Sequence, residues 1–522
     1  MHADLVLINA NILTMNASQP HARAVAVQGD RIVKAGSSKD IKAYIGKKTK
    51  VLDLREKTVI PGLIDTHAHV TAYGKSLTQI NLRGVNSIKE IQTRLLKRIQ
   101  RTPRGQWILG RGWDQDRLKE GRYPTRWDLD EVSPHNPVVL TRVCGHLSVA
   151  NSQALEKAAI TGSTQPPPSG QIDRDVRTKE PTGILREDAM ILVTKIISPP
   201  NEEELTEACS LACQKAVSAG LTSIHWLVNS PTEIRVIQKL HEQKRLLLRV
   251  YLIIPVKLLD HLVELGLKTG FGNTAIRIGS IKIYTDGSLG ARTAALSQPY
   301  HDKPSRQGLL LYTSEELNIL LEKAHKAGLQ LAIHAIGDRA IEMVLNQLEK
   351  LLKETPRQDH RHRIEHASVL NEQHIQRLKR LNAVVTVQPH FVVSDFWVPQ
   401  RLGPHRARWV YPFKTLIKKG IMTCGGSDCP IEPIEPLLGI YAAVTREALP
   451  EERITIDEAL RLYTSDAAFA SFEENIKGSI EVGKLADFTV LSHDLREVAP
   501  REIKNVKVEM TIVGGQAVYI GT

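Results

Sequence analysis

The feature that most constrains the fold is a local pattern that recurs through the middle of the chain. A helix-like segment ends in Gly or Asn and runs directly into an apolar strand at residues 216–226, 325–335, 379–389 and 417–428. Gly or Asn supplies the left-handed residue that closes a helix C-terminus. The TSEE segment at 313–316 is a capping box that opens one of these helices. Repeated helix–strand units imply parallel strands with crossover helices, so the pattern predicts an α/β fold.

Eight apolar runs have the length and composition of core strands. They occupy residues 62–69, 221–226, 248–254, 278–287, 329–335, 362–367, 383–389 and 421–428. Eight such units close into a (β/α)8, or TIM-like, barrel. The alternative is an open doubly wound sheet, which usually carries a glycine-rich phosphate loop after its first strand. No GxGxxG stands at a strand–helix junction of this sequence, so the barrel is favoured.

Both ends of the chain are rich in short strands. Residues 1–59 contain a hairpin turn at Gly29-Asp30, and residues 479–522 contain one at Gly514-Gly515. Two strand-rich ends around a different middle predict one small β-sandwich domain built from both termini.

A long segment does not fit the barrel count. We assign residues 60–75 and 195–478 to the barrel, and residues 76–194 to an α/β insertion after barrel strand 1. The insertion includes a further strand at 137–146. Insertions on this side of a barrel lie over its active face, so we expect this one to cover the substrate.

Charge and composition exclude several classes of function. The formal net charge of the 522-residue chain is +12, but aromatic residues make up only 5% of it, and the basic clusters at 47–50 and 94–104 lack them. We interpret these clusters as solvated faces and expect no nucleic-acid partner.

The chain also lacks the sequence marks of a membrane or secreted protein. No apolar run approaches the roughly 18 residues of a membrane helix, and no signal peptide is recognised. Five cysteines without a CxxC pair fit a reduced, cytoplasmic setting. The expected partner is a small-molecule substrate, and a homo-oligomer stays open because such barrels often associate through their outer helices.

Ligand-type side chains stand at the carboxyl ends of the predicted strands. His67 and His69 are two residues apart in PGLIDTHAHV, so they project to the same side of the first strand. Other strand ends carry Lys282, His334, His366 and Asp428. Imidazoles and carboxylates are normal ligands of zinc and its neighbours, whereas an inward lysine is costly unless its charge is changed or paired. These residues predict a divalent metal site at the face where barrel enzymes keep their chemistry.

The same residues resemble a known signature. PGLIDTHAHV and the order HxH, Lys, His, His, Asp resemble the amidohydrolase superfamily. The more specific resemblance is to the amidohydrolase 3 family, the group that contains N-substituted formamide deformylase. It is carried nearly end to end by segments such as GRGWDQ, PTRWDLDEVSP, GHLSVANSQAL, DGSLGARTAAL, HAIGDRA, RIEHASVL, QPHFVVSD, GGSDCPIEPIEPLLGIYAAVTR and GSIEVGKLADFTVL.

The resemblance implies a role for each ligand-type residue. His67, His69 and Asp428 would hold one divalent metal ion, with zinc favoured, and His334 and His366 would hold a second. Lys282 would bridge the two ions as a carbamate formed with CO2; if it stays an amine, one ion is expected. Asp428 is also the expected catalytic residue, which takes a proton from water and passes it to the leaving nitrogen.

Candidate substrate-binding residues fall into two groups. Tyr284, Asp286, Arg292, Gln388 and His390 lie at or just past strand ends. Trp113, Asp114 and His146 lie in the insertion. Each could instead brace a loop or a core. Glu365 precedes His366 and points the other way on its strand; it is a weaker candidate for the site, with packing or a helix contact as the alternative.

These observations favour a metal-dependent hydrolase that cleaves a non-peptide C–N bond of an amide, N-acyl or N-formyl small molecule. The first alternative is a deaminase or cyclic amidohydrolase on the same scaffold. The second is a non-catalytic scaffold or binding protein of the same fold, against which the complete ligand series argues.

Overall fold

The computed structural model describes residues 2–142, 145, 147–168 and 170–521. The chain divides into two compact units, one made of Met1–Tyr73 and Cys209–Thr522 and the other of Gly74–Ala208. Within the described part of the chain, no helix combines the length and apolar character needed to cross a membrane.

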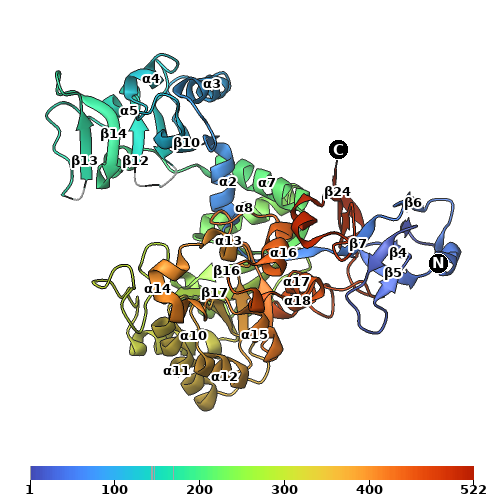
Figure 1. Cartoon of the computed structure of the whole chain (residues 1–522). Coiled ribbons are helices and arrows are strands. Elements are labelled where there is room, and N and C mark those ends of the chain that lie inside the picture. Colours follow the sequence, from blue (N-terminus) through green and yellow to red (C-terminus); the bar gives the residue numbers. More distant parts are fainter. Residues whose placement is uncertain (1, 143–144, 146, 169, 522) are drawn as a thin grey trace. The chain divides into compact units, whose positions relative to one another are not determined.

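The larger unit is built on a parallel eight-stranded sheet that curls into a barrel (Figure 1). Its strands are β8 (Leu63–Ala68), β15 (Leu221–Leu227), β16 (Arg249–Pro255), β17 (Ile276–Tyr284), β18 (Gln330–Ala335), β19 (Arg363–His366), β20 (Val384–Val387) and β21 (Thr423–Gly425). All eight predicted strands are present in the predicted order, so the (β/α)8 fold class is confirmed.

Hydrogen bonds between the first and last strands close the barrel. The hydroxyl of Thr66 donates to the carbonyl of Gly425 at 2.8 Å, and the backbone N–H of Asp428 donates to the carbonyl of His67 at 2.7 Å. Because these bonds join β8 to the β21 end, two segments about 360 residues apart in the sequence meet at one edge of the barrel.

Helices connect the strands and cover the barrel's outer face. They are α7 (Glu202–Ser218), α8 (Pro231–Glu242), α9 (Leu259–Glu264), α10 (Ser314–Lys326), α11 (Asp338–Glu354), α12 (Glu372–Arg380), α15 (Phe413–Lys418), α17 (Ile456–Leu462) and α18 (Ser465–Ala470). The predicted capping box is formed at α10, where Thr313 and Glu316 bond each other's backbone N–H groups. Three further helices, α13 (Phe391–Ser394), α14 (Val398–Ala407) and α16 (Pro436–Thr445), follow the carboxyl ends of β20 and β21.

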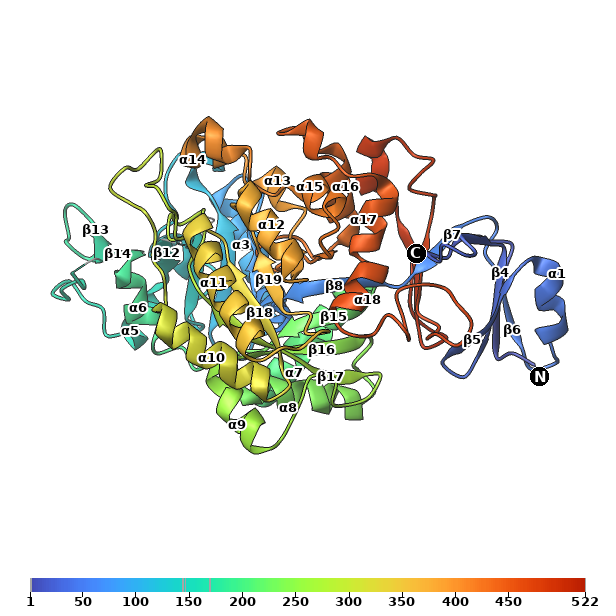
Figure 2. The ribbon, with the colours of Figure 1, turned by 90° about the horizontal axis from the view of Figure 1, so that it is seen from below.

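Strands from both ends of the chain form two further sheets of this unit. One has the order β5-β4-β1-β6 (Arg31–Gly36, Ala24–Gln28, Leu5–Ile8, Lys50–Asp53). The other has the order β24-β23-β22-β7-β2-β3 (Gln516–Ile520, Val508–Val513, Phe488–Leu491, Thr58–Pro61, Asn11–Leu13, His21–Ala22). Leu7 and Val25 of the first sheet share one apolar core with Ile12, Val59 and Phe488 of the second. Strand β7 runs on into β8 and so leads the chain into the barrel (Figure 2).

The smaller unit has its own sheet and core. The sheet order is β13-β14-β12-β11-β10-β9 (Gly170–Arg174, Pro181–Glu187, Leu147–Ala150, Val138–Arg142, Ile108–Trp113, Ile80–Asn81), and the unit's helices are α3 (Ile88–Ile99), α4 (Arg126–Asp130), α5 (Ser152–Lys157) and α6 (Ile191–Thr194). Helix α2 (Val70–Thr78) starts in the larger unit and ends in this one. Of the strand predicted at 137–146, residues 138–142 form β11, and residues 143, 144 and 146 lie outside the described residues.

Candidate metal centre

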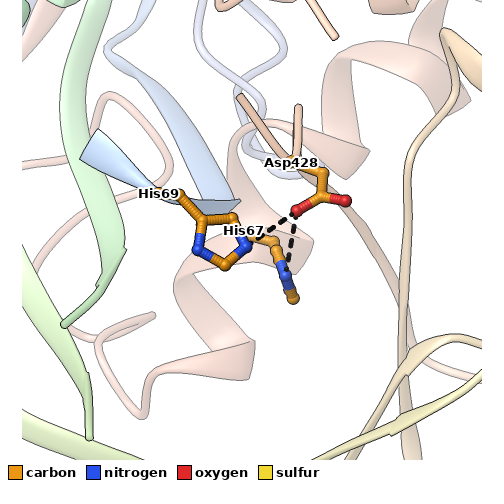
Figure 3. Close-up of side chains that lie close together, drawn as sticks. All are labelled: His67, His69 and Asp428. Carbon is orange, nitrogen blue, oxygen red and sulfur yellow. Dashed lines mark ion pairs between the residues drawn. The ribbon is translucent and has the colours of Figure 1, made fainter. Parts of the chain in front are cut away.

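Three side chains converge at the carboxyl end of barrel strand β8. His67 is buried near the end of β8, His69 follows this strand directly, and Asp428 lies three residues beyond β21 (Figure 3). One donor atom from each lies within 4.8 Å of the others. Oδ1 of Asp428 is 3.4 Å from Nε2 of His67 and 3.1 Å from Nε2 of His69. The same predicted alternation that aligned the two histidines therefore brings them to one carboxylate.

Local backbone geometry brings the Asp428 loop onto strand β8. A Cβ at Gly426 would lie 2.7 Å from the backbone N of His67, so only glycine allows this approach. The buried carboxylate of Asp65 then joins the two segments. It accepts bonds from the backbone N–H groups of His67 and Ser427, both at 3.0 Å, and from the Ser427 hydroxyl. Burial raises the pKa of Asp65 to about 6, against the effect of these bonds.

The donor set fits a divalent cation. Oδ1 of Asp428 is buried and has no hydrogen-bond partner among the described residues, which is costly for a carboxylate unless a cation compensates it. Burial opposes ionisation, yet the imidazoles of His67 and His69 hold the pKa of Asp428 well below its usual range. Two imidazole nitrogens and one carboxylate oxygen are ligands of zinc and related metals.

Glu365 fixes the orientation of His67. Its Oε2 accepts a hydrogen bond from Nδ1 of His67, which leaves the lone pair of Nε2 directed at the metal site. Its Oε1 pairs with Nε of Arg363 at 2.8 Å, and both side chains are fully buried. Burial opposes the charge of Glu365, but Arg363 and His67 outweigh it and lower the pKa of this carboxyl.

Lys282 lies inside the barrel beside the same imidazole. Its Nζ is 3.4 Å from Nε2 of His67 and 4.7 Å from the centre of the Tyr284 ring. Burial lowers the pKa of Lys282 to about 8, against the opposing fields of Glu365 and Asp428. The predicted inward direction of this lysine is therefore observed.

His334 and His366 stand next to each other on neighbouring strands, with ring centres 4.6 Å apart. Nδ1 of His366 donates to Oε1 of Gln388 at 2.7 Å, and Nε2 of His334 donates to the carbonyl of Gly287 at 3.1 Å. Burial lowers the pKa of His366 to about 3, and that of His334 well below its usual range. Each neutral ring thus keeps one nitrogen lone pair for a ligand.

Glu365 and His366 do not point to opposite sides of β19, as strand alternation predicts, because both lie beside His67. His366 has φ +73° and Ala367 has φ +43°, so the chain leaves the extended conformation at the end of β19. Strand alternation no longer applies there. As a result Glu365 contacts His67, while the ring of His366 also lies 5.0 Å from that of His67.

Two predicted substrate-binding residues, Tyr284 and Asp286, lie on the β17 side of the site. Tyr284 is 38% exposed, and its ring centre is 5.4 Å from that of His334. Asp286 is buried and accepts bonds from three backbone N–H groups, those of Ala295, Ile336 and Gly337. Burial raises the pKa of Asp286 to about 7.

Arg292 and His390 are each paired with a carboxylate. Arg292 makes a two-pronged pair with Asp302 on the loop after β17. His390 contacts Glu432 through its Nδ1.

The predicted residues of the insertion lie in the smaller unit. Trp113 is buried in that unit's core, and its indole N–H donates to the carbonyl of Leu140 at 2.8 Å. Asp114 pairs with Arg142 at 2.7 Å. His146 lies outside the described residues. A role of these three residues in binding substrate stays a prediction.

An eight-stranded barrel with a histidine–carboxylate cluster at the carboxyl ends of its strands has the architecture of a metal-dependent hydrolase. Comparisons with known proteins agree with this class. A metal-dependent hydrolase of uncharacterized function from Pyrococcus furiosus, known from its crystal structure, superposes with a TM-score of 0.81 at 34% identity, over 94% of this chain and 100% of its own.

Sequence comparisons define the family. The amidohydrolase family model matches residues 50–519. The putative amidohydrolase YtcJ of Bacillus subtilis (strain 168) is 35% identical over 97% of this chain and 98% of its own length. N-substituted formamide deformylase of Arthrobacter pascens is 29% identical over 99% of this chain and 98% of its own. The chain belongs to the amidohydrolase family, as its motifs predict, and is a hydrolytic enzyme acting on carbon–nitrogen bonds.

Proposed function

We propose that this enzyme hydrolyses a non-peptide C–N bond in a small-molecule amide, an N-acyl or N-formyl compound. The observation that carries the proposal is the convergence of His67, His69 and Asp428 within 4.8 Å at the carboxyl end of the barrel. The likeness to a formamide deformylase over nearly the whole of both chains supports the substrate class.

We infer that His67, His69 and Asp428 hold a first divalent ion, with zinc favoured, and that His334 and His366 hold a second where two are bound. When bound, such an ion lowers the pKa of a coordinated water to about 7 and polarises the substrate carbonyl. Lys282, buried among these residues, is the proposed carbamate: Nζ adds to CO2 and loses a proton, which replaces a buried cation by an oxygen ligand.

Asp428 performs the proton transfer in this proposal. As water adds to the carbonyl carbon, the Asp428 carboxylate takes its proton. When the C–N bond breaks, the electron pair goes to nitrogen and Asp428 returns the proton to it.

The test is product analysis with zinc-loaded protein on a panel of N-formyl and N-acyl amines. We expect equal amounts of carboxylic acid and amine, and loss of nearly all turnover in Asp428→Asn with part of the metal retained. A His493→Ala variant, changed at an exposed histidine that follows β22 of the terminal sheet, is the control. Release of ammonia from cyclic or amino-substituted substrates, without amide cleavage, would contradict the proposal and favour a deaminase.

A further inference from the structure

A histidine–glutamate pair lies at the carboxyl end of the barrel, outside the metal ligands. Nδ1 of His390 contacts Oε2 of Glu432, which is 8% exposed, while the His390 side chain is 21% exposed. His390 immediately precedes α13, and Glu432 lies in the loop between Asp428 and α16. These two helices lie side by side (Figures 1 and 2). The pair therefore joins the two loops that carry Gln388 and Asp428.

The pairing with Glu432 fixes the tautomer of the neutral His390 ring. A carboxylate only accepts hydrogen bonds, so Nδ1 of His390 carries the proton that points at Glu432. In the neutral ring, Nε2 then presents a lone pair. The side chain is 21% exposed, and Nε2 has no hydrogen-bond partner among the described residues, so it can accept a hydrogen bond from a ligand.

Gln388, two residues before His390 in the same loop, carries a hydrogen-bond donor. Gln388 is 1% exposed, and its Oε1 is used by His366. Its Nε2 is buried and has no hydrogen-bond partner among the described residues. An unpaired buried donor of this kind costs stability unless a ligand satisfies it.

An apolar side chain, Phe391, follows these two polar groups in the chain. The ring of Phe391 stacks on that of His366 at 6.4 Å between centres. It also lines an apolar cavity with Val392, Val398 and Val410. The segment 388–391 thus carries a hydrogen-bond donor on Gln388, an acceptor on His390 and an apolar ring on Phe391. Gln388 and Phe391 both contact His366.

We propose that this loop recognises a secondary amide with an apolar substituent: Gln388 Nε2 donates to the carbonyl oxygen, His390 Nε2 accepts the amide N–H, and the substituent packs against Phe391. Glu432 is a positioning residue that holds the tautomer of His390. The inference rests on the proposed amide hydrolysis and narrows its substrates to amides that keep an N–H.

The experiment compares N-phenethylformamide with its N-methyl derivative, which lacks only the N–H donor. For the zinc-loaded protein we expect kcat/KM for the secondary amide to exceed that for the tertiary amide by at least about tenfold, the effect of one hydrogen bond of about 1.4 kcal/mol. The His390→Phe variant should bring this ratio close to one, mainly through KM. His390→Gln, whose Oε1 can accept the same hydrogen, should restore part of it.

A second readout does not depend on turnover. The Kd of both amides is measured in the slow Asp428→Asn background, with and without His390→Phe, and should show the same change of ratio. The matched control is His261→Phe, because His261 also pairs with a glutamate, Glu264, but on the exposed face of α9. A ratio that His390→Phe leaves unchanged while amides are hydrolysed would overturn this inference alone. Failure of the wild-type protein to bind or cleave either amide would overturn the proposed function with it.

Discussion

The Glu365→Gln substitution tests the structure of the site most directly, because Glu365 binds three buried partners at once. Its carboxylate accepts from Nδ1 of His67 and pairs with Arg363, and the Thr386 hydroxyl donates to its Oε1 at 3.3 Å. Glutamine keeps the shape of the side chain but removes its charge. The consequences for stability and for metal binding can be worked out separately.

Loss of the charge leaves Arg363 as a buried cation without a carboxylate among its described contacts, which are Thr66, Thr386 and His225. Breaking a buried pair in this way costs about 3–5 kcal/mol of folding free energy. Loss of the carboxylate behind a metal-binding histidine costs about 10–100-fold in metal affinity, or about 1.4–2.7 kcal/mol.

Denaturant unfolding of the metal-free protein, followed by circular dichroism, measures the first quantity. Competition with a chromophoric zinc chelator measures the second. The control is Glu56→Gln, because Glu56 pairs with Arg23 on the exposed surface and should cost less than about 1 kcal/mol. If Glu365→Gln matches this control in both measurements, the assigned role of Glu365 is refuted.

A double variant separates the two effects. Adding Arg363→Met to Glu365→Gln removes the unpaired cation, so part of the lost stability should return. Zinc affinity should stay low, because His67 still lacks its carboxylate partner. If folding stability and zinc affinity both recovered in the double variant, Glu365 would act only through its ion pair with Arg363.

Further predictions concern the metal load and the response to acid. Lys282→Met should lower the metal content found by elemental analysis from about two ions per chain toward one, if the lysine bridges a binuclear site. At the opposite ends of the strands, His325 Nδ1 accepts from His362 Nε2 at 2.8 Å, and Nε2 of His360 donates to a backbone carbonyl. Burial lowers the pKa of these three histidines below that of the unfolded chain, about 6.5, so the unfolded state binds more protons in acid. Their contribution to stability should be complete above pH 6.5 and fall as the pH drops toward 5. Thermal unfolding in this range should show a shallower pH dependence in His362→Gln.

The sequence predicted those parts of the molecule that depend on local patterns. The barrel strands follow from short apolar runs, each after a helix that ends in Gly or Asn. His67 and His69 follow from the two-residue period of a strand. Both signals lie within a dozen residues, so no knowledge of distant contacts was needed.

The contacts that the sequence did not predict join residues on separate strands and loops. Asp65 binds Ser427, and Glu365 binds His67, about 360 and 300 positions away in the chain. Glu432 likewise reaches His390 from another loop. A strand-length run such as RIEH, with two opposite charges in a fully buried segment, was the one available signal, because charges in a barrel interior must be paired.

The same reasoning explains why the site departs from the strand rules where it does. Asp428 and His366 both have left-handed backbone angles, φ +56° and +73°, which glycine adopts without penalty and other residues adopt at a cost of about 1–3 kcal/mol. A chain selected only for stability would place glycine at these strand ends. That an aspartate and a histidine occupy them, each turned toward the ring of His67, means that the strain is maintained by the neighbouring contacts and serves the site. Strand periodicity therefore fails at the two positions where Asp428 and His366 turn toward His67.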